Sequence, residues 1–172
     1  MVRVSRADGE LVFWRGNSYL PYWKTDQGRW NLEEIIPRSG DGIEPMPDRV
    51  NLYSHVDIIT NNPEVVVVHW RYLCRFGAGN PCENVNPTNF VDEVFTISPK
   101  GQVKRIIKRA TAKIDEWNDP MNQITQRLRL KKNGIVKLSQ TGPGCSVAEK
   151  AIKGNPRKTS RMFDPILSFH FD

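Results

Sequence analysis

Short runs in which apolar and polar residues alternate follow one another along most of this chain, separated by clusters of Gly, Pro, Asn and Asp. Alternation with a period of two is typical of β-strands that bury one face. The pattern therefore predicts an all-β fold built from antiparallel strands. The expected strands cover residues 2–6, 10–15, 19–23, 29–30, 52–59, 65–74, 90–97, 102–112, 123–131 and 135–138.

Turn residues group these strands into four-stranded meanders. The pairs Asp8-Gly9 and Asn133-Gly134 can supply the positive φ angles of tight hairpin turns. A proline-rich stretch at 33–50 predicts a long surface loop. The expected organisation is a partial β-propeller over 1–139, with meanders at about 1–32 and 52–112, the start of a third at 122–139, and a poorly structured tail at 140–172.

Repeated four-stranded meanders separated by long loops are typical of propeller blades. Two blades and part of a third fall short of a closed propeller, which has about four to eight. Three explanations stay open at this point. The chain is a fragment of a longer protein, it self-associates through its open blade faces, or its meanders stack as an open sandwich.

Composition and charge narrow the classes of function. With 172 residues and 38% hydrophobic content, the chain can form a core. It has no run of about 18 apolar residues, so no membrane span is expected, and its first residues lack the apolar segment of a signal peptide. Twenty-five Lys and Arg against nineteen Asp and Glu give +6, which favours a polyanionic partner. Acidic polysaccharide, nucleic acid and an anionic surface all fit that charge.

The segment at 51–74 holds two of the three histidines in one predicted β-hairpin. If residues 60–64 form a five-residue loop and Ile59 pairs with Val65, His55 lies opposite His69, and opposite residues share a face. A two- or four-residue loop would place the histidines on opposite faces. The five-residue loop gathers four side chains on one face: Tyr53, His55, His69 and Arg71.

Other polar and aromatic residues have plainer interpretations. The three cysteines and His69 are scattered rather than spaced as a zinc site, so we expect no metal and no cofactor. Tryptophans on alternating strands are expected mainly in the core, with stacking on sugar rings as the alternative. Arg71 has Asp57 and Glu64 as candidate partners. A solvated strand face and edge is expected for the basic run Lys100, Lys104, Arg105, Lys108, Arg109 and Lys113.

Four motifs occur in one order along the chain: FWRGNSYLPYW at 13–23, EPM at 44–46, SHVDIITNNPEVVVVHWRY at 54–72 and VDEVFTISPKG at 91–101. Together they resemble the N-terminal part of the ulvan-lyase-like polysaccharide lyases, over about residues 11–130. The resemblance implies a seven-bladed β-propeller that cleaves acidic polysaccharide by β-elimination. It also implies an exported, extracellular or periplasmic protein of which this chain is an N-terminal fragment.

β-Elimination needs a base, an acid and a cation that neutralises the uronate carboxylate. By resemblance, the catalytic histidines fall on His55 and His69, and imidazole titrates in the range that acid–base catalysis requires. Arg71 is expected to bind the carboxylate through its fork of N–H donors. Tyr53 and Tyr72 are the nearest tyrosines and are predicted to contact substrate, although strict alternation points Tyr72 to the face opposite Arg71.

The chain departs from the family at 91–97, where the resemblance implies a tyrosine pair and this chain has Val94 and Phe95. Neither side chain transfers a proton, so the family's catalytic tyrosine has no counterpart there. This departure keeps a non-catalytic carbohydrate-binding or scaffold β domain as an alternative. A basic β protein that binds nucleic acid is a further, disfavoured alternative.

Overall fold

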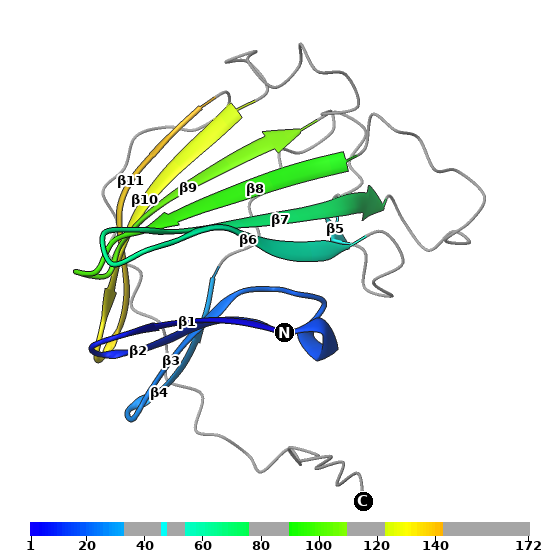
Figure 1. Ribbon diagram of the computed structural model, residues 1–172. Helices are drawn as coiled ribbons and strands as arrows, with labels where there is room; N and C mark the ends of the chain where they lie inside the picture. Colours follow the sequence, from blue (N-terminus) through cyan, green and yellow to red (C-terminus); the bar gives the residue numbers. More distant parts are fainter. Residues whose placement is uncertain (33–45, 48–53, 76–89, 110–122, 143–172) are drawn as a thin grey trace, which may run out of the picture.

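The computed structural model describes residues 1–32, 46–47, 54–75, 90–109 and 123–142 (Figure 1). These residues form eleven strands and one short 3₁₀ helix, and every strand pairing among them is antiparallel. The predicted all-β antiparallel fold is therefore confirmed. No helix in the described part of the chain is long and apolar enough to cross a membrane.

The first sheet is a simple meander in the order β1-β2-β3-β4. The 3₁₀ helix η1 (Arg15–Asn17) separates β2 from β3, and Ser18 and Tyr19 after it have φ angles of 52° and 56°. The helix and these left-handed residues interrupt the extended chain. As a result β2 ends at Phe13, earlier than the predicted residue 15, and β3 begins at Tyr22, later than the predicted residue 19. The strands are β1 (Val2–Arg6), β2 (Gly9–Phe13), β3 (Tyr22–Thr25) and β4 (Gly28–Asn31).

The second sheet is larger and follows the order β11-β10-β9-β8-β7, with β6 and the two-residue β5 pairing with β7. Because Gln123 of β10 pairs with Lys108 of β9, the last hairpin extends this sheet instead of starting a third one. The strands are β5 (Met46–Pro47), β6 (His55–Asn61), β7 (Val66–Arg75), β8 (Phe90–Ile97), β9 (Gln102–Arg109), β10 (Gln123–Lys131) and β11 (Gly134–Thr141). The first of these, β5, lies inside the stretch predicted as loop, and the rest of that stretch lies outside the described residues.

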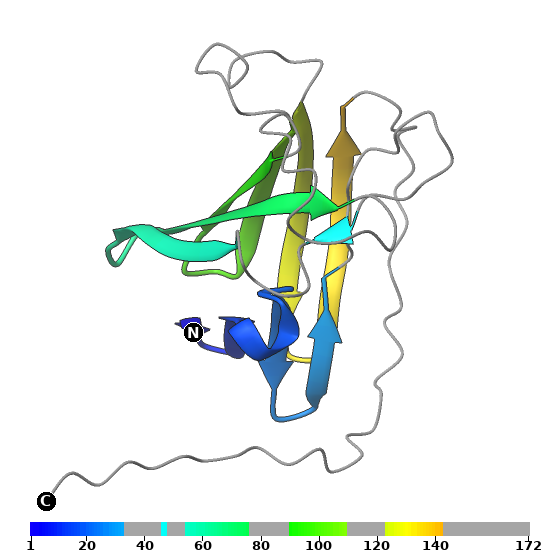
Figure 2. The ribbon, with the colours of Figure 1, turned by 90° about the vertical axis from the view of Figure 1, so that its right-hand side faces the viewer.

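The two sheets enclose one hydrophobic core (Figure 2). Phe13 of the first sheet packs edge-on against Phe95 of the second, with ring centroids 5.1 Å apart. The indole N–H of Trp23 donates to the backbone oxygen of Lys131 at 2.8 Å, which ties the first sheet to the β10–β11 hairpin. Three of the tryptophans are buried as predicted for core residues: Trp23, Trp30 and Trp70. Within the described part, this arrangement corresponds to the open-sandwich alternative.

Candidate active site on the outer face of the large sheet

The turn of the histidine hairpin is tighter than the sequence predicted. The backbone N–H of Asn62 donates to the oxygen of Val65 at 3.1 Å. The side-chain oxygen of Asn62 accepts hydrogen bonds from the backbone N–H groups of Glu64 (3.0 Å) and Val65 (2.8 Å). An Asn that satisfies two N–H groups in this way stabilises a compact turn. Pairing therefore begins at Asn61 and Val66 instead of Ile59 and Val65.

A β-bulge at Ile59 determines which face His55 occupies. Thr60 lies opposite Val67 and Ile58 opposite Val68, so Ile59 is the extra residue. Regular pairing beyond Thr60 would place His55 opposite Tyr72, on the buried face. The bulge returns His55 to the outer face, opposite Arg71.

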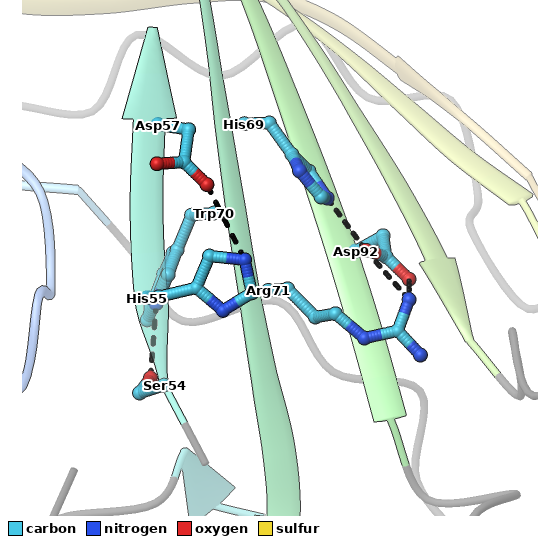
Figure 3. Close-up of polar contacts among 7 residues, drawn as sticks. All are labelled: Ser54, His55, Asp57, His69, Trp70, Arg71 and Asp92. Atoms are coloured by element: carbon cyan, nitrogen blue, oxygen red, sulfur yellow. Dashed lines mark hydrogen bonds and ion pairs between the residues drawn. The ribbon is translucent and has the colours of Figure 1, made fainter.

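The predicted direct opposition of His55 and His69 is thus wrong, because Asp57 lies opposite His69 and His55 is two pairs further along, opposite Arg71. The prediction that both histidines share a face with Arg71 agrees with the structure (Figure 3). The imidazole centroids are 6.2 Å apart and the rings are nearly perpendicular, at 86°. His55 and Asp57 form an exposed pair, with Nε2 and Oδ2 3.3 Å apart.

Asp92, opposite Arg71 on the adjacent strand β8, contacts two of these residues. Its side chain is 0% exposed, and its Oδ1 lies 2.5 Å from Nε2 of His69. Its Oδ2 lies 3.0 Å from Nη1 of Arg71, whose side chain is 26% exposed. Arg71 therefore pairs with Asp92, not with the predicted candidates Asp57 and Glu64. A buried carboxylate between two partially exposed donors fixes both of them relative to the sheet.

Sequence reasoning missed Asp92, although a signal was present. Asp92 and Glu93 are adjacent acidic residues in an otherwise apolar strand, so each must find a partner on its own face. Glu93 is on the core side, where Arg105 binds it with Nε–Oε2 and Nη2–Oε1 distances of 2.7 and 2.9 Å. Both of these side chains are 1% exposed. Arg105 is thus a buried exception in the basic run that was predicted to be solvated.

Of the two tyrosines predicted to contact substrate, Tyr72 does not lie with the histidines. Tyr72 is buried on the core side, as alternation along β7 predicted, and its hydroxyl donates to Oε1 of Glu93 at 2.8 Å. Tyr53 lies outside the described residues. The described part of the chain contains no group of three or more His, Cys, Asp or Glu side chains that could hold a metal ion.

The geometry suits proton transfer at an accessible surface. With Nε2 of His69 against Asp92, the carboxylate orients the imidazole and stabilises the cation that forms when the ring takes up a proton. His55 is exposed, with 57% of its side chain accessible, and stands next to His69 on the same face. Arg71 uses Nη1 for Asp92 and has further N–H donors for an anionic ligand.

Comparisons with known proteins identify no relative of this chain: no model of a protein family, no curated protein and no solved structure matches it.

Proposed function

We propose that this chain is part of a polysaccharide lyase that cleaves a uronic-acid-containing polysaccharide by β-elimination at the His55, His69 and Arg71 face. The observation that carries the proposal is the contact of His69 with the buried carboxylate of Asp92 at 2.5 Å, with Arg71 on the same carboxylate. This arrangement fixes the imidazole of His69, which is 18% exposed, beside the guanidinium of Arg71, which is 26% exposed. The order of sequence motifs that resembles ulvan-lyase-like enzymes supports the same function.

In this mechanism each residue has one role. Arg71 binds the uronate carboxylate and stabilises the negative charge that develops on it when the C5–H bond breaks. His69, oriented by Asp92, takes the C5 proton on its imidazole ring. The electron pair of that bond forms the C4–C5 double bond and expels the C4 oxygen, which takes a proton from His55. The products are a C4–C5 unsaturated uronate and a new free hydroxyl, and no redox partner is needed.

One observation favours a second candidate, a non-catalytic domain that binds acidic polysaccharide. Val94 lies opposite His69 on β8, where the resemblance implies a tyrosine, and Tyr72 points into the core. The described part of the outer face therefore offers no phenol to act as acid or base. Under this alternative, His55, His69 and Arg71 bind the anionic sugar without breaking its chain.

The test is product formation from uronate polysaccharides, followed by the ultraviolet absorbance of the unsaturated uronate. We expect His69→Ala, His55→Ala and Arg71→Ala each to lower turnover by about 10²–10⁴-fold, as loss of a positioned acid–base or charged group does. Lys24→Ala, an exposed change on the first sheet, is the control and should retain wild-type turnover. Near-wild-type turnover in both histidine variants would show that neither histidine is catalytic. Saccharide binding without any product would select the binding domain.

A further inference from the structure

The outer face that carries the histidines continues across the large sheet as a basic surface. The strand register places Lys108 opposite Asp92, and Lys104 directly opposite Arg127 on β10. Arg129 follows Arg127 on the same side of β10, because alternate residues of a strand share a face. We call Lys104, Lys108, Arg127 and Arg129 the basic track.

Two of these cations oppose each other without compensation. Lys104 and Arg127 are exposed neighbours across the β9–β10 ladder, and like charges in that position destabilise a sheet. On their other sides, Lys104 lies opposite the neutral Thr96 of β8 and Arg127 opposite the neutral Ser139 of β11. In the described part of the chain, no ion pair includes Lys104, Arg127 or Arg129.

Protection of a sheet edge does not explain the charges. The sequence predicted that this basic run covers a strand edge as well as a face, but β9 is hydrogen-bonded to β8 on one side and to β10 on the other. An interior strand has no free edge to protect. A repulsive pair at the centre of a sheet is understandable if an anionic ligand lies over it.

We propose that the basic track binds the flanking charged units of an acidic polysaccharide whose cleavage point lies at His55 and His69. This inference rests on the proposed function and extends it from one sugar to an oligosaccharide. Arg71 on β7 and Arg127 on β10 are three strand spacings apart, roughly 14–15 Å across the sheet, and the register offsets them by roughly 13 Å along the strands. A ligand that reaches both must be a polymer with anionic groups along its length.

The side chains around the track favour a glycan over a nucleic acid. Hydroxyl and amide groups that can bind sugar hydroxyls lie among the cations, from Gln123, Thr125, Ser139 and Thr141. Single-stranded nucleic acid needs exposed aromatic faces on which its bases stack. On the described outer face, Phe90 is the one aromatic residue besides the histidines, and the guanidinium of Arg71 covers its ring at 4.6 Å from the centroid.

The test compares two double variants that remove the same charge. Lys104→Ser/Arg127→Ser removes the centre of the track, and Arg3→Ser/Lys24→Ser removes two exposed cations from the first sheet. Binding is measured by titration calorimetry at fixed ionic strength. The probes are polygalacturonate, heparin, neutral dextran, and single- and double-stranded DNA.

We expect the wild-type chain to bind polygalacturonate and heparin and not to bind dextran. The track variant should bind them at least about tenfold more weakly, because two charge-assisted contacts are lost, whereas the control should change less than about twofold. Equal weakening of polysaccharide binding in both double variants would contradict the proposal, since any two exposed cations would then contribute equally. Tighter binding to DNA than to either glycan would assign the surface to nucleic acid. If the wild-type chain binds neither acidic polysaccharide, the proposal is rejected.

The outcomes separate this inference from the proposed lyase function. If the track variant forms product and its polysaccharide binding and KM are unchanged, the proposed role of the basic track is rejected and the proposed lyase function stands. Track-dependent binding without product would reject the lyase and leave an acidic-glycan-binding surface. A circular dichroism melt of each variant verifies that the fold is intact.

Discussion

Asp92, whose side chain is fully buried in β8, lies 2.5 Å from Nε2 of His69 on the outer face of the neighbouring strand. The same carboxylate also binds Arg71 at 3.0 Å. A buried charge is stable only while its partners remain, so this carboxylate links the stability of the sheet to the geometry of the site. The candidate site is therefore held by one residue that no ligand would reach.

We predict that Asp92→Asn lowers the free energy of unfolding by about 1–3 kcal/mol, because charge-assisted hydrogen bonds to His69 and Arg71 are replaced by weaker ones. Urea denaturation monitored by tryptophan fluorescence measures the change. Asp57→Asn is the matched control: its pair with His55 is exposed and should contribute no more than about 0.5 kcal/mol. Equal effects of the two substitutions would mean that Asp92 does not anchor the site.

The buried pair of Glu93 and Arg105 leads to a second prediction. Arg105→Met alone should destabilise the fold by about 3–5 kcal/mol, since it leaves the Glu93 charge buried without its main partner. The double variant Glu93→Leu/Arg105→Met should recover part of that loss, because both charges are removed together, while the buried Tyr72 hydroxyl loses its acceptor. A double-mutant cycle in urea gives the coupling energy. Additive effects of the two single substitutions would contradict the pairing.

Local sequence pattern predicted the bounds of individual strands well, because alternation is a property of neighbouring residues. Alternation placed β8 at 90–97 and β10 at 123–131, the bounds that the structure shows. The pairing of β7 with β8 joins segments separated by residues 76–89, so no short turn fixes its register. For that reason Asp92 could not be placed against His69 and Arg71 from the sequence.

The face that His55 occupies was predicted correctly although the turn was not. The reason is parity, because the face of a strand residue depends only on whether the pairing is shifted by an odd or an even number of residues. The side chain of Asn62 stabilises a turn one residue shorter than expected, which alone would have turned His55 toward the core. The bulge at Ile59 offsets that shift. Two local irregularities thus cancelled: the Asn62-Pro63 pair marks a turn without fixing its length, and the bulge has no distinctive sequence signal.

This parity argument gives a third prediction. Deleting Ile59 should remove the bulge, leave Thr60 opposite Val67 and Ile58 opposite Val68, and keep His55 on the outer face. Since Ile59 is 61% exposed, the deletion should change the free energy of unfolding by less than about 1 kcal/mol. A nuclear Overhauser effect between the rings of His55 and His69 should persist.

Deleting Ile58 together with Ile59 is the matched contrast. The second deletion shifts the pairing by one more residue and sends His55 to the buried face, opposite Trp70. The contact between the two imidazole rings should disappear, and the melting temperature should fall because a polar ring would enter the core. Loss of the ring contact after the single deletion would show that Ile59 is not the extra residue.

The last prediction concerns the opposed cations of the basic track. Lys104 faces Arg127 on one side and the neutral Thr96 on the other, so Lys104→Ser should raise the free energy of unfolding by about 0.2–1 kcal/mol at low salt. The gain should shrink as added salt screens the repulsion. Lys24→Ser is the control, because Lys24 lies between Glu10 and Arg29 and its two cross-strand interactions oppose each other. Urea denaturation at two ionic strengths measures both variants. If Lys104→Ser stabilises the fold and weakens polysaccharide binding, the repulsion between Lys104 and Arg127 is retained for ligand binding. A loss of stability in Lys104→Ser would contradict the predicted repulsion.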